Sequence, residues 1–64
     1  MLQVNGKEYA GVGKTVGNVV IEMNFDIRTI AVELNEEIVS KADYDSTTLK
    51  EGDVLEIVSF VGGG

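Results

Sequence analysis

Apolar and polar side chains alternate at the start of the chain, the pattern typical of a strand with one buried face. This pattern covers residues 1–5 and is followed at once by the turn dipeptide Asn5-Gly6. Both residues of that dipeptide tolerate the positive φ angles that a two-residue hairpin turn requires. A return strand is expected over residues 7–10. The first part of the sequence therefore predicts a β-hairpin.

The next segment has the spacing of an amphipathic helix. Thr15 is suited to the N-cap, because its hydroxyl can accept a hydrogen bond from the first turn. Asn24 can adopt the left-handed conformation that ends a helix. A lone strand over residues 19–23 is the alternative, since valine favours strands. The apolar stripe of the helix comprises Val16, Val19, Val20 and Met23, and its solvent-facing side comprises Gly17, Asn18 and Glu22.

The second half of the chain returns to strands. We expect strands over residues 29–34, 37–39 and 54–60, and a loop over residues 41–48. Tyr44 and Leu49 are expected to point inward. The predicted fold class is α+β: a mixed sheet of four or five strands with one main helix packed on one face. Because a crossover precedes it, the strand after the helix is expected to pair in parallel with an earlier strand.

The last predicted strand has two unequal faces. Leu55 and Ile57 are the better core candidates, because the opposite row contains Glu56. That assignment places Val58 and Phe60 on the face that the helix does not cover. An exposed apolar pair beside the chain end is a candidate docking patch. The alternative is that exposed apolar side chains on a small domain carry no function.

The sequence stops with Gly62, Gly63 and Gly64. Ordering three backbone residues costs about 3–6 kcal/mol, and glycine loses the most freedom, so we expect a flexible tail. A tail without side chains is suited to passing a carboxylate through a narrow channel into another protein's active site. A frayed terminus is the alternative. We therefore divide the chain into a domain over residues 1–61 and a tail over residues 62–64.

Composition excludes several kinds of chemistry. The chain contains no Cys and no His, which excludes thiolate metal sites, disulfides and a Ser-His-Asp arrangement. Its net charge of −6 at pH 7 argues against nucleic-acid binding. That charge favours a basic surface on a partner protein, or it simply keeps a small domain in solution. No apolar run approaches the roughly 20 residues of a membrane span, and a cytoplasmic location is the default expectation.

Several segments of the chain together match one known family: residues 2–6, Thr15-Val16, residues 30–35, residues 37–39, Tyr44, residues 49–58 and the ending Phe60-Val61-Gly62-Gly63-Gly64. On these segments the chain resembles the ThiS-type sulfur carriers of thiamine biosynthesis, which are ubiquitin-like β-grasp proteins. The similarity covers essentially the whole sequence. Glu36 departs from it, standing where the family usually has glycine.

The resemblance implies a chemistry for the C-terminus. An E1-like adenylyltransferase that uses ATP would adenylate the Gly64 carboxylate. Sulfur from a cysteine desulfurase relay would then displace AMP and leave a thiocarboxylate, from which thiazole synthase takes the sulfur. The carrier itself would be a monomer without a bound cofactor, a metal or catalytic residues, and not an enzyme.

Other functions remain open from the sequence. The sulfur could serve molybdopterin or another pathway. A ubiquitin-like modifier would instead form amide bonds to lysines through the same tail. A passive interaction domain would use the Val58–Phe60 patch alone and would not need its glycines.

Overall fold

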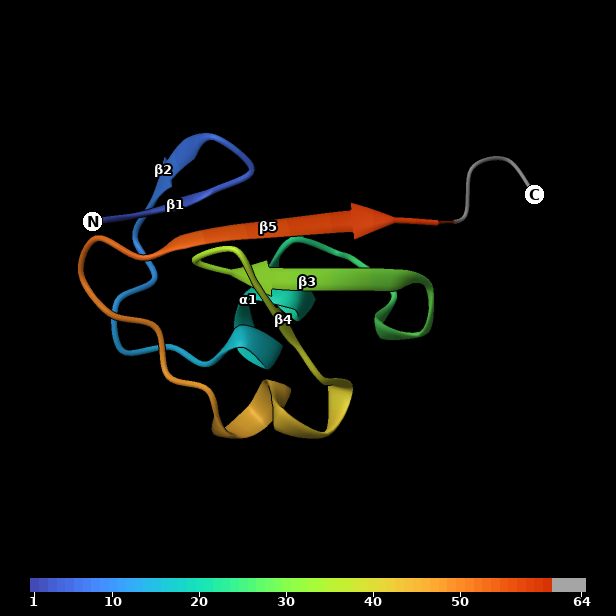
Figure 1. The fold of residues 1–64 in the computed structure, drawn as a ribbon. Helices are drawn as coiled ribbons and strands as arrows, with labels where there is room; N and C mark the ends of the chain where they lie inside the picture. The colour runs from blue at the N-terminus through green and yellow to red at the C-terminus, as the bar shows by residue number, and fades with distance from the viewer. Residues whose placement is uncertain (61–64) are drawn as a thin grey trace.

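The protein folds into a five-stranded mixed sheet packed against a single α-helix (Figure 1). The computed structural model describes residues 1–60. The strand order is β2-β1-β5-β3-β4. The predicted fold class is therefore confirmed. In residues 1–60, no helix is both long enough and apolar enough to cross a membrane. The elements are β1 (Leu2–Val4), β2 (Lys7–Tyr9), α1 (Val16–Glu22), η1 (Ile27–Thr29), β3 (Ile30–Leu34), β4 (Glu37–Val39), η2 (Lys41–Ser46) and β5 (Val54–Ser59), of which η1 and η2 are 3₁₀ helices.

Two tight turns close the two hairpins. Asn5 and Gly6 have φ angles of 51° and 84°, so the predicted turn between β1 and β2 is confirmed. Asn35 and Glu36 repeat this geometry between β3 and β4, with φ angles of 52° and 71°. Positive φ at both central residues gives the turn a twist that matches the strands it joins. Glu36 thus takes, with a side chain, a conformation that favours glycine.

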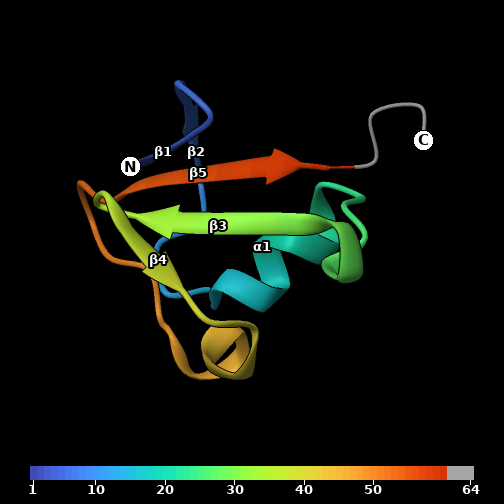
Figure 2. The ribbon, with the colours of Figure 1, turned by 45° about the vertical axis from the view of Figure 1, so that its right-hand side comes forward.

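The last strand occupies the centre of the sheet. β5 pairs in parallel with β1 and antiparallel with β3 (Figure 2). The prediction that the strand after the helix pairs in parallel with an earlier strand is wrong, because β3 has only β4 and β5 as neighbours. The parallel pair is formed by β5 instead. The central position of β5 agrees with the burial of Leu55 and Ile57, which are 0% and 5% exposed and belong to the core.

The helix begins with a reciprocal cap. Thr15 Oγ1 accepts a hydrogen bond from Asn18 N at 3.1 Å, and Asn18 Oδ1 accepts one from Thr15 N at 3.3 Å. These bonds satisfy backbone donors that have no partner inside the helix. The chain turns away at Asn24, which has the expected left-handed φ of 62°. The helix is therefore confirmed, and the alternative of a lone strand over residues 19–23 is excluded.

Gly17 corrects the predicted faces of the helix. It is buried, although we expected it on the solvent side. The reason is η2, which packs on this side of α1: a Cβ atom on Gly17 would lie 2.2 Å from Asp45 Oδ1. Residues 41–46 thus form a short helix that covers Gly17, where we expected a loop.

The core lies between α1 and the inner face of the sheet. The buried residues of α1 follow the predicted helical spacing, and those of the strands follow the predicted alternation. Tyr44 and Leu49 are buried as expected. Met23 is only partly buried at its edge. The buried apolar residues are Leu2, Val4, Val16, Val19, Val20, Ile30, Val32, Tyr44, Leu49, Leu55 and Ile57.

Candidate functional site

The candidate site is the C-terminal end of β5, where the described chain finishes at Phe60. In Figure 1, β5 runs away from the N-terminus along the middle of the sheet. Gly62, Gly63 and Gly64 lie outside the described residues. The flexible tail and the boundary between residues 1–61 and 62–64 therefore remain predictions.

Backbone contacts hold the chain as far as Phe60. Its N–H donates to Thr29 O at 2.7 Å, one residue beyond the end of β5. Thr29 is itself held by Asp26, whose backbone oxygen accepts from Thr29 N at 2.9 Å. Asp26 also caps η1, because its Oδ1 accepts from Arg28 N at 3.0 Å. The root of the predicted tail is thus attached to a capped turn.

The charges of that turn stabilise it further. Arg28 Nη2 lies 3.0 Å from Asp26 Oδ2. The hydrogen bond from the Arg28 guanidinium, aided by the one from its backbone N–H, holds the pKa of Asp26 below its usual range. Sequence reasoning did not single out Asp26. Its signal is an aspartate two positions before Arg28, the spacing at which an Asp side chain accepts from a following backbone N–H.

Two asparagine side chains extend the hydrogen bonding of β5. Ile57 N donates to Asn5 Oδ1 at 2.8 Å, and Val54 N donates to Asn35 Oδ1 at 2.9 Å. The pairing of β1 with β5 ends at Val4 and Leu55, so Asn5 carries it two residues further. These asparagines were predicted only as turn residues. Their turns also place their side chains beside the strand that leads to the tail.

The predicted docking residues are on the surface. Val58 is 54% exposed and Phe60 is 68% exposed, so the assignment of the two faces of β5 is confirmed. The structure contains no partner, and their docking role remains a prediction.

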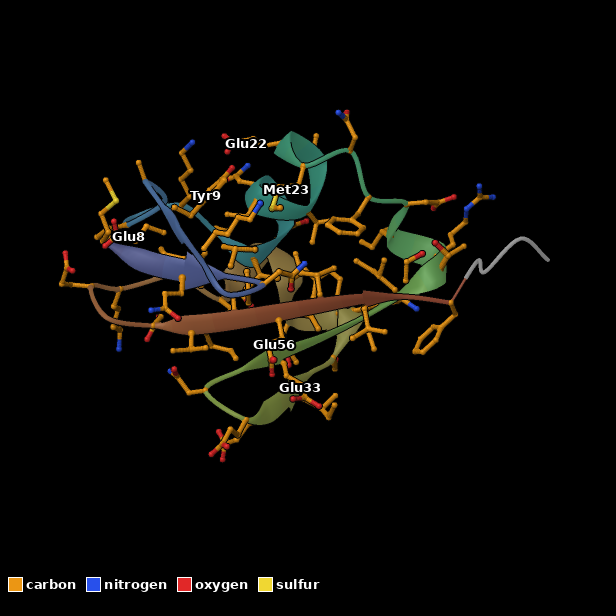
Figure 3. The ribbon with its side chains drawn as sticks, turned by 90° about the horizontal axis from the view of Figure 1, so that it is seen from above. Glu8, Tyr9, Glu22, Met23, Glu33 and Glu56 are labelled. Carbon is orange, nitrogen blue, oxygen red and sulfur yellow. The ribbon has the colours of Figure 1, made fainter. Side chains whose placement is uncertain are left out.

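A separate polar cluster ties the first hairpin to the helix. Tyr9 Oη donates to Glu22 Oε1 at 2.5 Å, and both residues are labelled in Figure 3. Lys14 Nζ donates to Glu22 Oε2 at 2.6 Å. The bond to Glu22 raises the pKa of Tyr9, and the bonds from Lys14 and Tyr9 lower the pKa of Glu22. In residues 1–60, no group of three or more acidic side chains is arranged to hold a metal ion. The cluster joins β2, and the loop that follows it, to α1.

The family model described as the ThiS family matches residues 2–64. The chain belongs to the ThiS family. The resemblance noted from the sequence is thereby confirmed. Curated relatives that match over their full length are named sulfur carrier proteins. Among curated ThiS proteins, the sulfur carrier protein ThiS of Bacillus subtilis is 38% identical, and the match covers 100% of both chains. The corresponding protein of Thermus thermophilus is 36% identical, again over 100% of both chains.

Solved ThiS structures share the fold. The crystal structure of a thiamine biosynthesis protein (ThiS) from Geobacter metallireducens is 34% identical, with a TM-score of 0.78. That match covers 98% of this chain and 97% of the other. The identity and the nearly complete coverage confirm the expected ubiquitin-like β-grasp fold.

Longer relatives contain a similar segment. A thiazole synthase of Paramagnetospirillum magneticum is 44% identical over 98% of this chain. The chain spans only 20% of that protein's length, and the same share of a thiazole synthase of Magnetococcus marinus.

Proposed function

We propose that this ThiS chain carries sulfur for thiamine biosynthesis as a thiocarboxylate at the Gly64 carboxylate. The observation that carries the proposal is similarity over the full length to curated sulfur carriers, up to and including the final glycine. The architecture supports it, because the folded body holds the chain up to Phe60 and four residues follow.

The chemistry has to be supplied by partners. A carboxylate is a poor acceptor until a leaving group is attached to it. An E1-like adenylyltransferase would transfer AMP from ATP to Gly64, with release of pyrophosphate. The terminal sulfur of a persulfide on a cysteine desulfurase relay would then displace AMP and form an acyl disulfide. A second thiol of the relay would act as the two-electron reductant, releasing the thiocarboxylate and leaving a disulfide on the relay. This chain has no Cys and no His, so it offers neither a thiolate for a persulfide nor the commonest general base.

Thiazole synthase is the proposed acceptor of the sulfur. Support comes from the two thiazole synthases, which include a segment similar to this chain within their own length. Such a segment places a carrier-like unit beside the enzyme that would consume its sulfur. ATP is consumed by the activating partner, so the carrier needs no cofactor of its own. A monomeric carrier in the cytoplasm is the form that we propose.

The body of the carrier serves as a recognition surface. Val58 and Phe60 are exposed apolar side chains next to the tail root, and a partner that takes up the tail has to pass them. Burial of an apolar side chain contributes about 1.5–3 kcal/mol when it is complete. We therefore assign partner docking to Val58 and Phe60 and chemistry to Gly64.

Intact-mass measurement tests this function. The purified carrier is incubated with an activating enzyme, ATP and a sulfur donor, and one oxygen is expected to be replaced by sulfur. Omission of ATP, or deletion of Gly64, should abolish the change while the circular dichroism spectrum stays that of the folded protein. An unchanged mass in the complete reaction would overturn the proposal. A ladder of conjugates at higher mass would point to a protein modifier instead.

A further inference from the structure

The face of the sheet opposite α1 is uncovered in the described chain. Leu55 and Ile57 point toward the helix, so the alternate residues of β5 point outward. Register places Glu33 beside both Glu56 and Ile38 on this side. We use the name outer sheet face for the surface formed by six residues: Glu33, Ile38, Val54, Glu56, Val58 and Phe60.

This face is apolar at its margins and acidic in its middle. Its four apolar members, Ile38, Val54, Val58 and Phe60, are between 42% and 69% exposed. Glu33 and Glu56 are directly opposite each other on neighbouring strands, and Figure 3 shows them side by side. Two like charges in this position destabilise a sheet. The free protein therefore maintains an unfavourable pair at the centre of its exposed face.

Within residues 1–60, no ion pair balances the charges of the two carboxylates. Neither forms an ion pair or a side-chain hydrogen bond there, and Lys14 and Arg28 are paired with other acids. Lys7, the one basic residue within the described strands, is in register with the buried Val4 and so belongs to the opposite side. Lys41 and Lys50 are exposed and lie outside the strands, and no ion pair joins either of them to Glu33 or Glu56. The acidic pair is therefore free to receive a counter-charge from a partner.

We propose that Glu33 and Glu56 together receive an arginine or lysine side chain of the activating enzyme, which projects from an apolar surface onto the outer sheet face. The inference rests on the proposed function, because it assigns a partner to the same site. Charge complementarity selects this occupant: a cation between the carboxylates removes their repulsion, and the apolar residues around it exclude water and strengthen the attraction. The face extends to Phe60 at the tail root, so an enzyme that holds the Gly64 carboxylate covers it.

A double variant gives two readouts of opposite sign. In Glu33→Gln/Glu56→Gln the repulsion is gone, so the free protein is expected to melt at a higher temperature than the wild type. The same change removes the receptor for the cation, so the dissociation constant of the complex is expected to rise about tenfold or more. The dissociation constant of the wild type should rise with salt concentration, and that of the variant should rise less steeply.

A matched control removes two charges elsewhere. Glu37 is in register with Leu34, a residue packed against the core, and so faces the other side of the sheet from Ile38. Glu51 lies in the turn before β5. Glu37→Gln/Glu51→Gln has the same net charge as the test variant. This control variant is expected to change the dissociation constant by no more than about twofold. Glu37 lies off the outer sheet face, and the exposed ion pair between Glu51 and the Met1 amino group contributes little.

Calorimetric titration of the activating enzyme, with thiocarboxylate yield at saturating enzyme measured in parallel, decides the question. Weakened binding and a raised melting temperature in the test variant alone support the proposal. Unchanged binding with normal thiocarboxylate formation overturns it and leaves the proposed function intact. A lowered melting temperature overturns the repulsion argument. Loss of affinity for thiazole synthase alone overturns the assignment to the activating enzyme. Absence of thiocarboxylate in the wild type overturns the proposed function, and this inference with it.

Discussion

The side chain of Asn5 is expected to make a measurable contribution to the stability of the central strand. Asn5→Ala removes the oxygen that accepts from Ile57 N at 2.8 Å. It leaves a part-buried N–H unpaired, which costs about 1–3 kcal/mol. It also places alanine at a φ of 51°, where the left-handed conformation costs about 1–2 kcal/mol. The sum of about 2–5 kcal/mol is large against the roughly 3–10 kcal/mol expected for a domain of this length.

Asn5→Gly separates the two contributions. Glycine accepts the positive φ without strain, so this variant loses only the hydrogen bond and should be more stable than Asn5→Ala by about 1–2 kcal/mol. Urea denaturation measures both free energies of unfolding, and hydrogen exchange at the Ile57 amide reports the bond itself. Equal stability of the glycine variant and the wild type, with unchanged protection at Ile57, would refute the reasoning.

Three further predictions concern the helix, the docking patch and the polar cluster. Gly17→Ala should raise the free energy of unfolding by about 0.5–1 kcal/mol, because alanine favours a helix. The atom nearest to the added Cβ belongs to the exposed Asp45 carboxylate, which can rotate away. A variant that is less stable in thermal denaturation would show that Asp45 is fixed. Phe60→Asp should weaken calorimetric binding to the activating enzyme and leave the fold intact, and unfolding would contradict its 68% exposure. The lowered pKa of Glu22 means that its ionised form stabilises the fold above the usual carboxyl pKa of 4.5 and that this contribution is lost as pH falls through the folded pKa. The raised pKa of Tyr9 means that the stability contributed by its protonated form is lost as pH rises beyond 10.0. In chemical denaturation, Glu22→Gln should be less stable than the wild type near neutral pH and should converge with it in acid. A difference in stability that stays constant with pH would disprove the linkage.

Local pattern was enough for most elements of the fold. The alternation of Leu55, Glu56 and Ile57 assigns the two faces of β5, and Asn5-Gly6 places the first turn. These signals depend on near neighbours in the chain. The burial of Gly17 does not, because it is caused by η2, more than twenty residues later.

Strand order also exceeds what local pattern reveals. Alternation shows which side of a strand is buried and not which strand lies beside it, so the parallel partner was assigned to β3 and not to β5.

The site shows the same division. The exposure of Val58 and Phe60 follows from alternation. The approach of Glu33 to Glu56 depends on the register between β3 and β5, and the bond from Ile57 to Asn5 joins residues 52 positions apart. Neither is visible in a sequence window.

Localising the sulfur within the product tests the central claim most directly. Cleavage after Glu56 by a glutamate-specific protease releases the C-terminal peptide of residues 57–64 from the reacted carrier. Tandem mass spectrometry of this peptide should find the additional sulfur in the fragment that contains Gly64 and in no other. Sulfur found at an internal position, or a C-terminal fragment that still carries both oxygens, would contradict the account.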